Sequence, residues 1–359
     1  MPDEVQIKQF DLSDQQALLS FLRNAYRDDP RKSDPAFWKW HYLENPFTSV
    51  DDVPLWVVKN GREVVGQLAT IPVDLKVGEE TTRAIWILDF IVDRNYRGQG
   101  LGKRLVFAAR EWCPTMITLG INEQSTAVFR SLKWEALGGL HRYHKLIFPG
   151  YAFGEIARVA PLRILANLGF ALSRARLARR VTADNEAIRS VTAFNGAFAQ
   201  LWSRASVQWP CAVKRDPDFL DWQFRRQPGK QFEVLGYYEG DLLVGYVVLF
   251  FRKPERGGIS PKAAITDFCY QPEFADRIIK GLLGAALQQT LERRAGSLVT
   301  DILDERVEAW LKRYGFWQIK NSPQFMASTN ERQELIYEPR CWYLTRADSD
   351  VSIFEQSNV

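Results

Sequence analysis

A stretch near the N-terminus recurs in the second half of the chain. Residues 34–46 and 216–228 share an aspartate, two prolines, a phenylalanine and a tryptophan at identical spacing, 182 positions apart. Later landmarks keep nearly the same offset, since Asp89 falls opposite Asp267. Loop insertions explain a small drift, whereas a chance similarity would not keep one offset so far. At 359 residues the chain is long enough for two or three domains, and we expect two copies of one unit.

Each copy is predicted to be a mixed α/β unit. The Asp-Pro pair begins a helix, because proline suits the first helical turn. Two strands joined by a tight turn follow, at 55–60 and 63–73 in the first copy and at 232–238 and 242–251 in the second. A central strand, a helix, a closing strand and a last helix complete each copy. We place the domain boundaries at 1–150 for the first copy, 151–200 for a helical linker, 201–347 for the second copy and 348–359 for a tail.

The linker is expected to hold two helices, one over 154–180 that is broken at Pro161 and one over 184–202. Residues 174–180 are basic and amphipathic. Such a segment suits an acidic partner or a membrane surface. It also suits a solvated helix whose arginines lie near its C-terminus. We expect the solvated helix.

A glycine-rich segment, Arg-Gly-Gln-Gly-Leu-Gly at 97–102, follows a strand-like run at 85–92 and opens a helix-like run at 103–112. A turn of this kind leaves several backbone N–H groups unpaired at the start of the helix. The helix dipole adds positive potential there, which makes the place an anion site. Glycines keep side chains away, so a large phosphate ester can lie against the backbone. The segment therefore predicts a phosphate-binding loop.

At these residues the chain resembles the GCN5-related N-acetyltransferase (GNAT) superfamily. The hallmark of that family is Arg/Gln-x-x-Gly-x-Gly/Ala between the fourth strand and the following helix, and Arg97, Gly100 and Gly102 fill it. The resemblance implies two tandem GNAT domains, acetyl-CoA as acyl donor and its pyrophosphate on this loop. The expected cofactor-binding residues are Phe90, Ile91, Val92, Arg97, Gly98, Gln99, Gly100, Leu101, Gly102, Lys103, Asn122 and Phe129. For Phe90, Ile91 and Val92, whose strand is splayed by a bulge in the family, the expectation concerns main-chain groups only.

A dinucleotide-binding fold competes for the same glycines. Its Gly-x-Gly-x-x-Gly pattern would need the third glycine one residue later than Gly102. No acidic residue ends the next strand, 116–120, to bind a ribose. We therefore favour the CoA loop.

Two carboxylates are candidate catalytic bases. Asp89 is a lone acid in an apolar strand, where burial would raise its pKa towards a useful range. Because Asp267 repeats it, a structural role is equally open. Glu123, at the end of the following strand, is the second candidate. Where the family commonly has a tyrosine that protonates the thiolate this chain has Phe129, which has no proton to donate.

The second copy lacks the phosphate loop. At the Asp89-to-Asp267 offset, Arg97 falls on Ala275 and the residues at 98–102 fall on 276–280, which contain no glycine. We expect one CoA site per chain, in the first copy. The second copy would wall the acceptor site.

The leading hypothesis is an acyl-CoA-dependent N-acyltransferase acting on an amine of a small molecule, sugar or peptide. A non-catalytic CoA-binding or regulatory module and a cell-wall-type aminoacyl or peptidyl transferase remain alternatives. The net charge of +4 is too diffuse to indicate nucleic acid. No apolar run is long enough to span a bilayer, no signal peptide is recognised, and four scattered cysteines suit the cytoplasm. No residue cluster indicates a metal, and the sequence does not indicate an oligomeric state.

Overall fold

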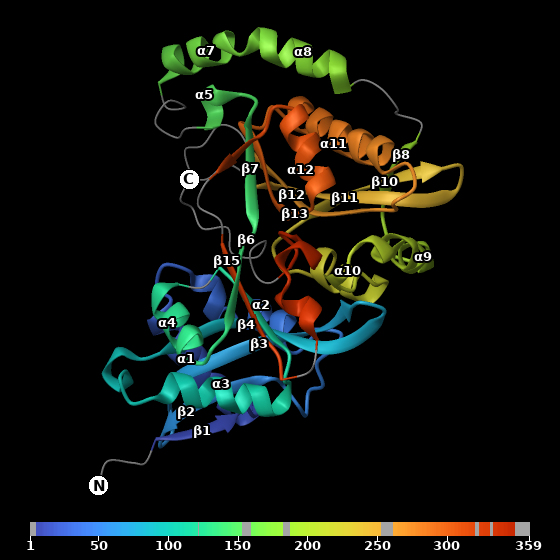
Figure 1. Cartoon of the computed structure of the whole chain (residues 1–359). Helices are drawn as coiled ribbons and strands as arrows, with labels where there is room; N and C mark the ends of the chain where they lie inside the picture. The colour runs from blue at the N-terminus through green and yellow to red at the C-terminus, as the bar shows by residue number, and fades with distance from the viewer. Residues whose placement is uncertain are drawn as a thin grey trace.

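The structure is a computed structural model, and it describes residues 5–120, 122–152, 159–181, 187–252, 261–319, 323–330 and 333–348. Two lobes lie one above the other in Figure 1. The lower lobe holds mainly the first half of the chain, and the upper lobe mainly the second half. The described residues form one continuous hydrogen-bonded sheet that runs through both lobes.

The first half of the chain contains the elements β1 to β7. Along the chain they are β1 (Gln6–Gln9), α1 (Gln15–Ala25), α2 (Pro35–Tyr42), β2 (Leu55–Asn60), β3 (Glu63–Val77), β4 (Glu80–Val92), α3 (Leu101–Trp112), β5 (Met116–Leu119), α4 (Glu123–Ser131), β6 (Glu135–Gly139) and β7 (His141–Leu146). The helices α5 (Pro149–Ala152), α7 (Ala160–Gly169) and α8 (Ala171–Val181) follow. These three connect the two halves.

The second half repeats this order of elements, with the strands β9 and β16 added. It contains β8 (Ile188–Val191), α9 (Gly196–Ala205), β9 (Cys211–Val213), α10 (Pro217–Phe224), β10 (Phe232–Glu239), β11 (Leu242–Arg252), β12 (Lys262–Tyr270), α11 (Ala275–Glu292), β13 (Ser297–Leu303), α12 (Glu305–Arg313), β14 (Trp317–Ile319), β15 (Gln324–Ser328) and β16 (Trp342–Thr345). The strand pairs predicted for both copies are present. The fold is a mixed α/β fold, as the sequence predicts.

The helix expected over 184–202 is wrong in its first part. Residues 188–191 form the strand β8, which pairs antiparallel with β10, and α9 begins only at Gly196. Tertiary pairing decides this, because β8 adds an outer strand to the second half as β1 does to the first. The linker residues 153–158 and 182–186 lie outside the described residues.

The repeated Asp-Pro pairs start α2 and α10 in the same way. The Asp34 carboxylate accepts a hydrogen bond from the Phe37 backbone N–H at 2.7 Å, and the Asp216 carboxylate accepts one from the Phe219 N–H at 2.9 Å. Each aspartate thus satisfies an N–H group that the helix itself cannot pair. The repeat therefore preserves a helix start.

The two helices meet across the boundary between the halves. The Trp40 indole N–H donates to the Trp222 carbonyl at 3.0 Å, and the Trp222 indole N–H donates to the Trp40 carbonyl at 2.9 Å. Their rings stack with centroids 5.1 Å apart, and both side chains are buried. The reciprocal bonds show that the two copies face each other across an approximate two-fold axis. Both tryptophans are therefore core residues.

The halves also exchange a strand. β7, from the first half, pairs antiparallel with β13 and β14 of the second half. β15, from the second half, lies between β5 and β6 of the first half. Figure 1 shows β7 rising into the upper lobe and β15 descending into the lower one. Each half therefore completes its sheet with a strand of the other.

Candidate functional site

The central strand of the first half parts from its neighbour near its C-terminal end. β4 pairs with β5 only from Ile85 to Ile87. A bulge follows, because Ala69 of β3 faces Leu88 while Gln67 faces Ile91. The Gln67 amide donates to the Asp89 carbonyl at 3.1 Å. The splay expected from the family is present, and beyond the bulge β4 has no pairing with β5 among the described residues.

The glycine loop lies at the same end of the sheet, between β4 and α3. Gly98 and Gly100 have φ angles of 79° and 74°, in the left-handed region that glycine tolerates. A Cβ added at either would meet no atom within 4 Å. Gly100 precedes α3 and makes no side-chain cap, so the first N–H groups of the helix are presented to an open surface. This geometry suits an anion.

The other loop residues divide into surface and core. The Arg97 guanidinium donates to the Val92 carbonyl at 3.0 Å and to the Gln124 side chain at 3.3 Å, so it fastens the loop to β4 and α4. Gln99 and Lys103 are exposed. Leu101 is buried, so only its main chain faces the loop. The glycine motif did not indicate Gln124 as a partner of Arg97, because Gln124 lies outside the motif.

Packing leaves little room for a side chain at Gly102. A Cβ added there would lie 3.1 Å from Cζ of Phe90, whose ring packs against Phe129 with centroids 5.6 Å apart. Phe129 is fully buried and also packs on Trp134 at 4.5 Å. The ring of Phe129 is thus a core element beneath the loop.

Asn122 and Glu123 lie at the start of α4. The Asn122 side-chain oxygen accepts from the Ser125 N–H at 2.8 Å, which makes Asn122 the N-cap of the helix. Glu123 is exposed in the first turn. Both residues follow the end of β5, the strand from which β4 parts.

Asp89 is held by two side chains. The Lys32 ammonium pairs with Oδ1, and the Tyr42 hydroxyl donates to Oδ2 at 2.8 Å. The Asp89 side chain is 4% exposed and that of Lys32 13%. Burial alone would raise the pKa of Asp89, but the charge and hydrogen bonds of Lys32 and Tyr42 outweigh it and lower that pKa below its ordinary value. The expectation of a raised pKa is wrong.

His41, next to Tyr42, is fully buried behind this pair. Burial lowers its pKa to about 3, although the nearby Asp89 carboxylate works in the opposite direction. His41 is therefore neutral at physiological pH. The repeat has Gln223 at its position, which is also buried.

The second half builds a similar centre around Asp267. The Asp267 carboxylate accepts hydrogen bonds from the Thr345 and Tyr246 hydroxyls at 2.7 Å each, and lies 3.4 Å from the Arg215 guanidinium. Arg215 also pairs with Asp348 at 2.5 Å. All these groups are buried. A carboxylate at the strand bulge is thus bound to a cation and a tyrosine in both halves.

The loop of the second half is shorter than its counterpart. Residues 93–100 join β4 to α3, whereas residues 271–274 join β12 to α11. The alignment of Arg97 with Ala275 at a constant offset is therefore wrong. Ala275 is the first residue of α11, and Phe274 precedes α11 as Gly100 precedes α3. The Asp276 carboxylate accepts a hydrogen bond from the Trp310 indole. No glycine-lined anion loop exists among these described residues.

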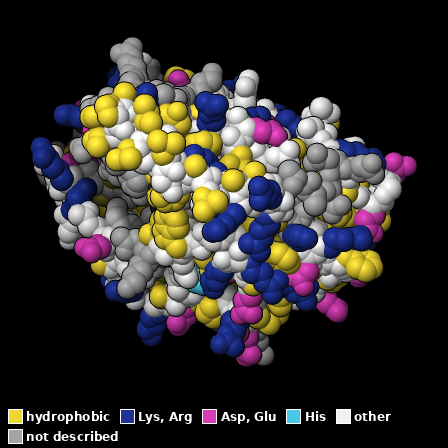
Figure 2. Space-filling model, turned by 90° about the horizontal axis from the view of Figure 1, so that it is seen from above, with side chains coloured by type: hydrophobic (Ala, Val, Ile, Leu, Met, Phe, Trp, Pro, Cys, Tyr) yellow, Lys and Arg dark blue, Asp and Glu magenta, His cyan; other side chains and the backbone are white. Residues whose placement is uncertain are grey.

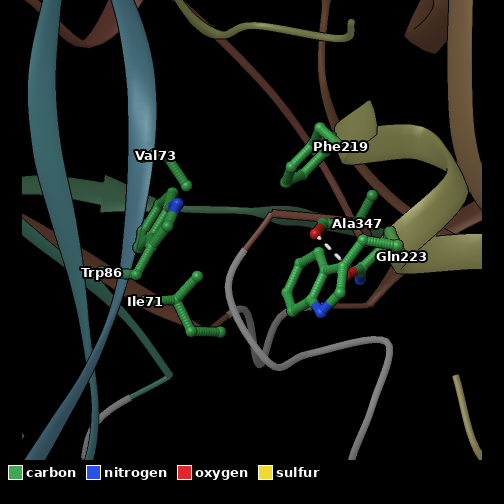
Figure 3. Close-up of a pocket in the computed structure, with 7 residues that line it drawn as sticks. Ile71, Val73, Trp86, Phe219, Gln223 and Ala347 are labelled. Atoms are coloured by element: carbon green, nitrogen blue, oxygen red, sulfur yellow. Dashed lines mark hydrogen bonds between the residues drawn. The ribbon is translucent and has the colours of Figure 1, made fainter. Parts of the chain in front are cut away.

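A small cavity lies between the two halves (Figure 3). Trp86 of β4 lines it from one side and Gln223 of α10 from the other. Trp222 of α10 also lines it. Its walls are apolar except for Gln223, whose amide donates to the Ala347 carbonyl at 3.4 Å. The remaining lining residues are Ile71, Val73 and Phe219.

The strand exchange brings His141 of β7 next to an acidic residue of the second half. His141 Nδ1 lies 2.9 Å from a carboxylate oxygen of Glu308 on α12, which also accepts from the Tyr143 hydroxyl at 2.7 Å. No group of three histidine, cysteine or acidic residues able to hold a metal occurs among the described residues. Within the same ranges no helix is long and apolar enough to cross a membrane.

The comparisons with known proteins agree with this geometry. Residues 19–134, which include the glycine loop and Asp89, match the model of the acetyltransferase (GNAT) family. A search of curated proteins gave no match. The chain has the fold of GNAT acyltransferases.

Solved structures extend the fold likeness to most of the chain. A GCN5-related N-acetyltransferase from Anabaena variabilis aligns over 90% of this chain and 72% of its own, with a TM-score of 0.62 and 13% identity. A probable N-acyltransferase from Enterococcus faecalis aligns over 91% and 73%, with a TM-score of 0.60 and 12% identity. Saccharomyces cerevisiae N-myristoyltransferase with bound myristoyl-CoA aligns over 91% and 83%, with a TM-score of 0.58 and 10% identity. At these identities the likeness concerns the fold.

Proposed function

We propose that the chain is a cytoplasmic acyl-CoA-dependent N-acyltransferase that binds one CoA, on the glycine loop of its first half. The observation that carries the proposal is the meeting of two features at one end of the sheet. Gly98 and Gly100 open the start of α3 to an anion, and β4 parts from β5 directly beside it. The pyrophosphate would lie on the loop, and the pantetheine arm would enter the gap.

Acyl transfer needs the thioester carbonyl polarised as the amine attacks and the thiolate leaves. Within the segment Phe90, Ile91 and Val92, beyond the bulge, the main-chain N–H groups that point away from β3 are the proposed donors to that carbonyl. Phe129 is buried and has no proton to give, so the thiolate would take its proton from water or from another group. We infer an amine acceptor on a small molecule, sugar or peptide.

Asp89 and Glu123 take different roles in this proposal. A carboxylate held by Lys32 and Tyr42 is a weak base, since its pKa is lowered. We infer that Asp89 fixes the bulge. Glu123 is exposed beside the gap and is the remaining candidate base.

The CoA site is tested by calorimetry with three variants. Gly100→Glu places a carboxylate where the pyrophosphate would lie and is expected to abolish CoA binding. Gly100→Ala carries the same positive φ, which costs an alanine about 1–2 kcal/mol, without the charge, and separates backbone strain from repulsion. Phe274→Glu makes the matched change in the second half at an exposed residue and should leave CoA affinity unaltered. Two CoA sites per chain, or tight binding by Gly100→Glu, would contradict the proposal.

A non-catalytic CoA-binding module is the second candidate, favoured by Phe129 and by the firmly held Asp89. Thiol release from acetyl-CoA in the presence of a set of amines separates the two candidates. The yeast enzyme in the comparison binds myristoyl-CoA. The same assay with acetyl-CoA and long-chain acyl-CoA would therefore give the preferred chain length, which we expect to be acetyl.

A further inference from the structure

The helices α7 and α8 lie across the top of the upper lobe in Figure 1. The apolar side chains of α7 are exposed. None of its residues is buried. Leu165 is 68% exposed, Leu168 64%, and Leu172, at the start of α8, 63%. Leu162 and Ile164 are also more than half exposed. At helical spacing the four of these side chains that belong to α7 share the side of that helix that carries no charged residue.

Figure 2, which views this surface from above, shows hydrophobic side chains gathered in one patch with lysine and arginine side chains beside it. Scattered exposed leucines are normal on a protein surface, but a contiguous apolar patch marks an interaction site. The helix is thus amphipathic with its apolar side towards solvent.

The inner side of α7 is already occupied. The Asn167 side chain accepts a hydrogen bond from the Gly150 N–H at 3.0 Å. A Cβ on Gly150 would lie 2.3 Å from the Arg163 carbonyl oxygen, so α5 packs closely there. In α8, Leu177 and Val181 are buried, and α8 packs against α11. The helix pair is fixed to the protein, so α7 presents its apolar face as a rigid surface.

The charge of this segment has one sign. Residues 159–181 contain five arginines and no aspartate or glutamate. Arg176 and Arg179 are exposed on α8, next to the apolar face of α7. An apolar face bordered by cations matches the boundary between acyl chains and anionic headgroups. At ten residues, about 15 Å long, α7 can lie in that boundary but cannot span a bilayer.

We propose that α7 and α8 dock the protein on an anionic membrane surface, with the apolar face of α7 in the interfacial layer and the α8 arginines on headgroups. A second copy of the chain fits this surface less well, because two such faces would bring the exposed arginines Arg176 and Arg179 of both copies together with no acid in either segment. This inference concerns a surface remote in sequence from the glycine loop and does not depend on the proposed CoA site.

Vesicle flotation of the full chain tests the proposal. We expect binding to vesicles of equal parts phosphatidylglycerol and phosphatidylcholine, weak binding to phosphatidylcholine alone, and release at high salt. Leu165→Glu combined with Leu168→Glu should abolish binding. Arg176→Gln should weaken it roughly fivefold, the equivalent of about 1 kcal/mol per charge near the surface. Val207→Glu, at a 70% exposed residue of the second half, is the matched control and should bind as the unaltered protein does.

Thermal unfolding shows whether the double variant remains folded, and sedimentation velocity without lipid shows its oligomeric state. Failure of the unaltered protein to float with anionic vesicles would overturn the proposal. So would unaltered flotation of the folded double variant. A dimer that Leu165→Glu and Leu168→Glu disperse would instead assign the face to a second copy.

Discussion

Replacing Asp89 with asparagine should destabilise the fold more than it harms the chemistry. The change keeps the shape of the side chain and removes its charge. Lys32 is then left 13% exposed with no countercharge on Asp89, and the Tyr42 hydroxyl faces an amide. A structural role for Asp89 therefore predicts a large loss of stability.

The magnitude follows from the burial of the pair. Removing one partner of a buried ion pair costs about 3–5 kcal/mol, because the other charge stays buried without compensation. Lys32 keeps some access to water, so we expect the lower end, about 3 kcal/mol. Lys32→Met removes the cation of the pair as well. The double variant should therefore be more stable than Asp89→Asn alone, by about 1–2 kcal/mol.

Urea unfolding of the two single variants and the double variant measures this coupling, and acyl transfer is measured on the same samples below their unfolding range. An Asp89→Asn protein within 1 kcal/mol of the original, but with turnover reduced a hundredfold or more, would refute the structural role and make Asp89 the base.

The ion pair also predicts a dependence of stability on pH. The pKa of Asp89 is lowered in the folded protein, whereas in the unfolded chain it is about 3.9. The unfolded state therefore binds the proton first as the pH falls. The contribution is complete above about pH 5 and is lost as the pH falls through the folded pKa. In Asp89→Asn this acid-side loss should be smaller.

Three further perturbations follow from the packing. Trp40→Ala or Trp222→Ala should each cost about 3–5 kcal/mol in urea unfolding, since each empties a buried site and breaks one of the two reciprocal hydrogen bonds; a loss under 1 kcal/mol would contradict the core role. His41 is neutral in the fold, with a pKa of about 3, so only the unfolded state takes up its proton between pH 6.5 and pH 5. The free energy of unfolding should therefore fall by about 2 kcal/mol over that range. His41→Gln should remove this part of the dependence of stability on pH. Residues 1–150 alone should not give a soluble monomer on size-exclusion chromatography, because β5 and β6 lose the strand β15 that lies between them. A variant in which segment 323–330 follows residue 140, in place of β7, should give more soluble monomer.

Much of the fold could be predicted from sequence because its signals are local. The Asp-Pro helix starts depend on a carboxylate three residues from the N–H it caps, and Asp34 and Asp216 were recognisable for that reason. The glycine loop depends on φ angles that few other residues adopt, so Gly98 and Gly100 indicated it directly. The strand β8 was missed because its pairing partner, β10, lies far along the chain.

The sequence by itself determined three features: the duplication, the mixed α/β class and the loop of the candidate CoA site. Periodicity, helix caps and glycines indicate these features because each acts within a few residues. Only the tertiary structure decided that β7 and β15 change places, because both strands fit the same sheet position and sequence does not show which half takes which. It also decided the state of Asp89. Burial and a neighbouring cation shift a pKa in opposite directions, and the sequence did not show that Lys32, far along the chain, is the cation that prevails.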